Sequence, residues 1–100
     1  MMEHLYWNGY LRTDKLRQAL HYAYQKQRLP GVDEYVIERF MTGLEKVRLN
    51  LGSKYEKIDH LEMEKIFEIL GRDHGDKLTD QQLQTIGNVL LDEHFEYVVY

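Results

Sequence analysis

The sequence predicts an all-α protein, a single-domain bundle of about four helices, and three observations indicate this class. Apolar residues recur at helical spacing in four separate segments. Two of these segments begin with a capping box and a hydrophobic staple, which together mark a helix start. The chain has 100 residues and no cysteine, and a chain of this length can bury a core without disulfides or metals.

The first helix is expected at about 13–28. Proline disfavours helix at the residue before it, and glycine permits a tight turn, so Pro30 and Gly31 are expected to follow the helix end. The inward-facing positions of this helix are Leu16, Ala19, Leu20 and Ala23. They form one stripe at helical spacing.

The second helix is expected at about 33–51 and has the longest amphipathic pattern in the chain. Asp33 is its capping residue, and Val32 is placed to contact Ile37 as a hydrophobic staple. Gly52 suits the left-handed turn that follows many helices. Its inward stripe consists of Val36, Ile37, Phe40, Met41, Leu44, Val47 and Leu51. We therefore expect this helix to be the main element of the core.

The third and fourth helices are expected at about 60–70 and 79–93, joined by a polar loop. Their starts share one pattern: capping pairs Asp59 with Glu62 and Thr79 with Gln82, and staple pairs Ile58 with Met63 and Leu78 with Leu83. In a capping box each side chain satisfies a backbone amide of the other residue, so both helix starts are strongly specified.

The two ends of the chain leave two alternatives open. Residues 1–11 are aromatic around a central Asn8-Gly9, and residues 94–100 are rich in residues that favour strands. These segments either pair as short strands or pack irregularly on the bundle.

Charge is distributed unevenly along the chain, whose net charge is −4. Residues 1–50 carry eight Lys and Arg against six Asp and Glu, a charge of +2, whereas residues 51–100 carry five against eleven, a charge of −6. Segment 12–28 holds five basic residues and one acidic residue. No apolar run approaches the roughly 20 residues of a membrane span, and no basic leader is evident, so a cytoplasmic protein without membrane contact is expected.

Two motif resemblances fail on their chemistry. The apolar frame of 67–83 resembles an EF-hand, but among the ligand positions of the 71–82 loop only Asp73 supplies a carboxylate. Whether this loop binds any ion stays open. Segment 79–96 resembles the start of a repressor-type helix-turn-helix, but the residues after Gly87 are acidic and would be repelled by phosphates.

Candidate partner-binding residues lie in the aromatic N-terminal segment and on the first helix. Tyrosine and tryptophan combine an apolar body with a polar tip and are frequent where proteins meet. The residues selected on this basis are Trp7, Tyr10, Arg17, His21, Tyr24 and Arg28. The last four are at helical spacing, so they are expected on one face of the first helix. The alternative is that the tyrosines pack under a loop and the cations are solvated.

These features predict a small non-enzymatic interaction domain, such as a regulator, inhibitor, immunity-like protein or adaptor. The expected partner is another protein, with a second copy of the chain as one candidate for a homodimer. An alternative function is a nucleic-acid-associated regulator that uses the basic segment 12–28. A second alternative is a metal-dependent enzyme that uses His, Asp and Glu of 59–76. No specific catalytic, cofactor-binding or metal-ligating residue is predicted.

Overall fold

The computed structural model describes residues 9–52, 57–72, 78–93 and 98–99. Within these ranges the elements are β1 (Tyr10–Arg12), α1 (Thr13–Gln25), α2 (Glu34–Asn50), β2 (Lys57–Ile58), α3 (His60–Arg72), α4 (Asp80–Glu93) and β3 (Val98–Val99). The expected all-α class, with four helices and short strands, is confirmed. None of the described helices is long and apolar enough to cross a membrane.

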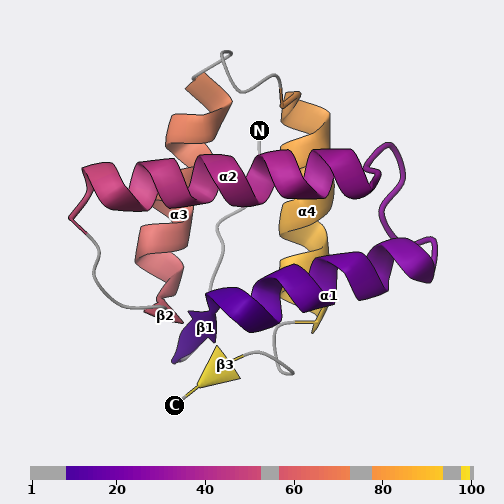
Figure 1. Cartoon of the computed structure of the whole chain (residues 1–100), viewed down its shortest axis with the longest axis horizontal. Coiled ribbons are helices and arrows are strands. Elements are labelled where there is room, and N and C mark those ends of the chain that lie inside the picture. Colours follow the sequence, from indigo (N-terminus) through magenta and orange to yellow (C-terminus); the bar gives the residue numbers. More distant parts are fainter. Residues whose placement is uncertain (1–8, 53–56, 73–77, 94–97, 100) are drawn as a thin grey trace.

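The helices form two layers (Figure 1). Helices α1 and α2 lie side by side in the front layer and run across α3 and α4, which form the back layer. Helix α1 contacts α4, α2 contacts α3, and α3 contacts α4. The core therefore lies between the layers, and the outward side of α1 and α2 is left uncovered by the other described elements (Figure 1).

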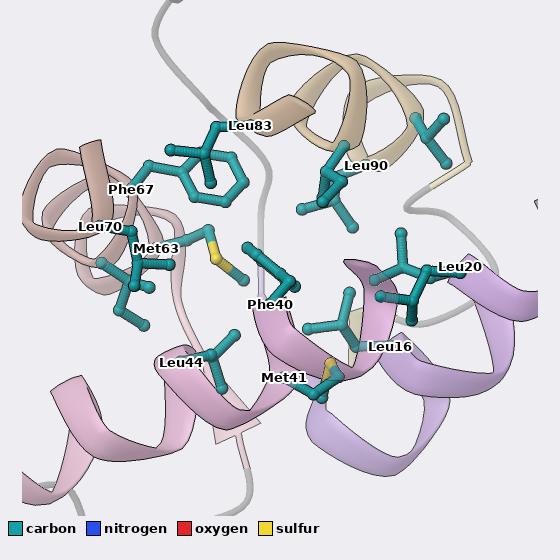
Figure 2. Close-up of a cluster of buried hydrophobic side chains, with 14 of the residues drawn as sticks. Leu16, Leu20, Phe40, Met41, Leu44, Met63, Phe67, Leu70, Leu83 and Leu90 are labelled. Atoms are coloured by element: carbon teal, nitrogen blue, oxygen red, sulfur yellow. The ribbon is translucent and has the colours of Figure 1, made fainter. Parts of the chain in front are cut away.

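The core between the layers is entirely apolar in the described part of the chain. No polar or charged residue of these ranges is buried. Figure 2 shows side chains from all four helices meeting around Phe40, whose ring is fully buried. The rings of Phe40 and Phe67 pack edge to face, with centroids 5.5 Å apart. The expected inward stripes are thus confirmed, except that Leu51 is exposed and Val36 is half-buried.

The predicted helix starts are formed by side-chain hydrogen bonds. At α4 the capping box is complete, because the Gln82 amide donates to Thr79 Oγ1 and the Thr79 amide donates to Gln82 Oε1, both at 3.0 Å. At α2 the Val36 amide donates to Asp33 Oδ1 at 2.9 Å. At α3 the Glu62 amide donates to Asp59 Oδ1 at 2.8 Å. The positive φ of +77° at Gly52 also confirms the left-handed turn after α2.

The predicted end of the first helix is wrong by three residues. Helix α1 stops at Gln25, five residues before the proline. The Arg28 amide donates to the Ala23 carbonyl and the Gln27 amide to the Tyr24 carbonyl, which is the Schellman pattern. Gln27 occupies the left-handed position of this motif, with φ +59°. Sequence reasoning missed this end because the position is normally held by glycine or asparagine.

The left-handed Gln27 leads to a stability prediction. We expect Gln27→Gly to raise the free energy of unfolding by about 0.5–1 kcal/mol, because the strain of a side chain at positive φ exceeds the added entropy of the unfolded chain. Urea denaturation followed by circular dichroism measures the change. The matched control is Gly31→Ala, at φ +77° with no atom within 4 Å of the added Cβ, which should lower stability. A lower stability for Gln27→Gly would contradict the prediction.

The strands form a small antiparallel sheet in the order β2-β1-β3. Tyr10 pairs with Val99 and Leu11 with Val98, so the paired-strand alternative for the two ends holds for these residues. Strand β2 was not expected, because a two-residue strand has no periodic signal; it pairs Ile58 with Leu11. Residues 1–8 of the aromatic N-terminal segment lie outside the described residues.

The structure of α4 bears on the helix-turn-helix resemblance, whereas the EF-hand resemblance concerns the loop before this helix. Helix α4 continues through Gly87 without a turn, so the rejection of a helix-turn-helix there is confirmed. Residues 73–77 of the 71–82 loop lie outside the described residues, and its ion binding stays untested. Gln82 Nε2 donates to the Gly31 carbonyl at 3.2 Å, which joins the start of α4 to the turn before α2.

Candidate interaction surface

The two aromatic candidates near the N-terminus have different outcomes. Trp7 lies outside the described residues. Tyr10 is the first residue of β1, and its side chain is exposed. It belongs to the sheet of order β2-β1-β3, directly before the start of α1.

Arg17 and His21 face the neighbouring helix α2. Arg17 Nη1 lies 2.6 Å from Glu38 Oε1, and His21 Nε2 lies 2.9 Å from Glu38 Oε2. His21 Nδ1 lies 3.7 Å from Glu34 Oε2. These groups form a polar seam between α1 and α2. Because Arg17 and Glu38 are about half exposed, their attraction is screened by water and orients the helices more than it stabilises them.

Tyr24 and Arg28 do not continue the helix face on which they were expected to lie together with Arg17 and His21. Arg28 follows the end of α1 and belongs to the Schellman turn, so helical spacing does not place it beside Tyr24. Tyr24 remains on α1 and is partly exposed. The structure therefore does not assemble the four predicted α1 residues into one continuous binding face.

Much of the basic charge of segment 12–28 is engaged within the chain. Arg12 Nη2 lies 3.2 Å from Asp14 Oδ2, and Arg17 pairs with Glu38. Lys26 Nζ lies 5.5 Å from the centre of the Tyr22 ring, within cation–π range. Cations that already pair with carboxylates release fewer counterions when they meet phosphates, so this segment is a weaker nucleic-acid surface than its composition indicates.

A different set of residues lines the outward side of α2. Residues at steps of four and three along a helix lie on one face, and this face is opposite the buried stripe of α2. We call this set the outer stripe: Tyr35, Arg39, Thr42, Lys46 and Leu49. Four of the five side chains are exposed, and that of Arg39 is half-buried.

Tyr35 and Arg39 form an ordered pair on the outer stripe. The guanidinium carbon of Arg39 lies 4.4 Å from the centre of the Tyr35 ring, and Nη2 donates to the Tyr35 hydroxyl at 2.7 Å. A guanidinium that packs against a ring keeps further N–H donors, and these can bind a carboxylate. The pair thus presents an aromatic surface beside a directional cation.

The ends of the outer stripe carry the two most exposed large hydrophobic side chains of the described residues. Tyr35 is 64% exposed and Leu49 is 76% exposed. Between them are Arg39 and Lys46, and the stripe contains no carboxylate. Burial of these exposed aromatic and aliphatic groups against another molecule would be favourable in free energy.

Sequence reasoning missed the outer stripe, although its signal was present. The apolar residues of 33–51 recur on the inward side of the helix, and their pattern does not describe the opposite side. The steps from Tyr35 to Leu49 alternate four and three residues, a spacing that can be seen directly in the sequence. What the sequence did not show is that this side of α2 is left uncovered by the other described helices.

Within the described ranges, no group of three or more His, Cys, Asp or Glu side chains is arranged to hold a metal ion. Comparison of the chain with protein-family models, curated proteins and solved structures finds no match.

Proposed function

We propose that the chain is a non-enzymatic protein-interaction domain whose contact surface is centred on the outer stripe of α2. The ordered Tyr35–Arg39 pair is the observation that carries this proposal. Tyrosine and arginine are the residue types, with tryptophan, that most often supply the binding energy of protein interfaces. A domain of this kind acts as a regulator, inhibitor or adaptor through shape and charge.

The ordering of the pair supports binding in a second way. Binding normally restricts long side chains such as arginine, which lowers affinity. Arg39 is already held against the Tyr35 ring and by a hydrogen bond to its hydroxyl, so less freedom remains to be lost. Tyr24 on the neighbouring helix α1 is also partly exposed and can widen the contact.

Nucleic-acid binding by segment 12–28 has weaker support. Arg12 and Arg17 pair with Asp14 and Glu38 within the chain. The chain also carries a net charge of −4, which opposes approach to phosphates.

A site-specific crosslinking experiment tests the proposed surface. A photoreactive amino acid is placed at Thr42, in the middle of the outer stripe, and in a second protein at Leu61, an exposed position on α3. In extract of the source cells we expect the Thr42 probe to crosslink one specific protein and the Leu61 probe not to do so. Arg39→Ala in the Thr42 probe protein should lower the affinity for this partner about tenfold, the effect typical of an interface hot spot.

Three outcomes would overturn the proposal. The partner could crosslink from Leu61 and not from Thr42, which would place the contact on α3. The crosslinked molecule could be nucleic acid. Finally, Arg39→Ala could leave the binding of the crosslinked partner unchanged although circular dichroism shows a folded protein.

A further inference from the structure

We draw no further inference here: the strongest candidate, the exposed outer stripe on the outward side of α2, carries nothing beyond the proposed function because nothing in the described part of the structure shows what covers it.

Discussion

Phe40→Ala is expected to lower the free energy of unfolding by about 3–5 kcal/mol, because it removes a fully buried ring and leaves a cavity. Phe40 lies where side chains from both layers meet, and its ring also packs edge to face on Phe67 (Figure 2). A domain of this size has a total stability of about 5–15 kcal/mol. The variant is therefore expected to be close to the limit of folding at room temperature.

Urea denaturation followed by circular dichroism measures the Phe40 effect, and Phe40→Leu keeps it measurable if the alanine variant does not fold. Leucine fills most of the cavity, so a loss of about 1–2 kcal/mol is expected. The matched control is Leu61→Ala, an exposed position on α3, with an expected change of about 0.5 kcal/mol or less. Equal effects at Phe40 and Leu61 would show that the two layers do not close on Phe40.

Arg48→Ala is expected to lower the free energy of unfolding by about 2–3 kcal/mol. Arg48 Nε donates to Glu62 Oε2 at 3.0 Å, and Nη2 donates to the Lys57 carbonyl at 3.2 Å. The side chains of Arg48 and Glu62 are only 12% and 20% exposed. In the alanine variant the Glu62 carboxylate would therefore lose its charged hydrogen-bond donor at a position where water is a poor substitute. One side chain thus joins the end of α2 to β2 and to the start of α3.

A double-mutant cycle separates the ion pair from the other effects of the substitution. For Arg48→Ala and Glu62→Ala we expect a coupling of about 1–2 kcal/mol, because the pair is largely shielded. The control cycle uses Arg17→Ala and Glu38→Ala, whose side chains are 49% and 45% exposed. Its coupling should be about 0.5 kcal/mol or less. A larger coupling for the exposed pair than for Arg48 and Glu62 would show that shielding from water does not determine the strength of these ion pairs.

The starts of α2, α3 and α4 could be predicted because the groups that form them are close in sequence. Asp33, Asp59 and Thr79 each accept a hydrogen bond from an amide three residues later, and this contact forms within the segment itself. The inward stripes were predictable for the same reason, since helical spacing alone places Phe40 and Leu44 on one side.

The tertiary structure alone decided which helix surfaces contact another helix and which remain uncovered. Arg17 and Arg39 are both basic residues on helices, yet Arg17 lies against Glu38 of α2 while Arg39 lies on the uncovered side of the same helix. Similarly, Glu62 belongs to a capping pattern in the sequence, but its carboxylate receives Arg48 from α2. Such contacts depend on how the layers cross, and the crossing is set by the packing of side chains far apart in the chain.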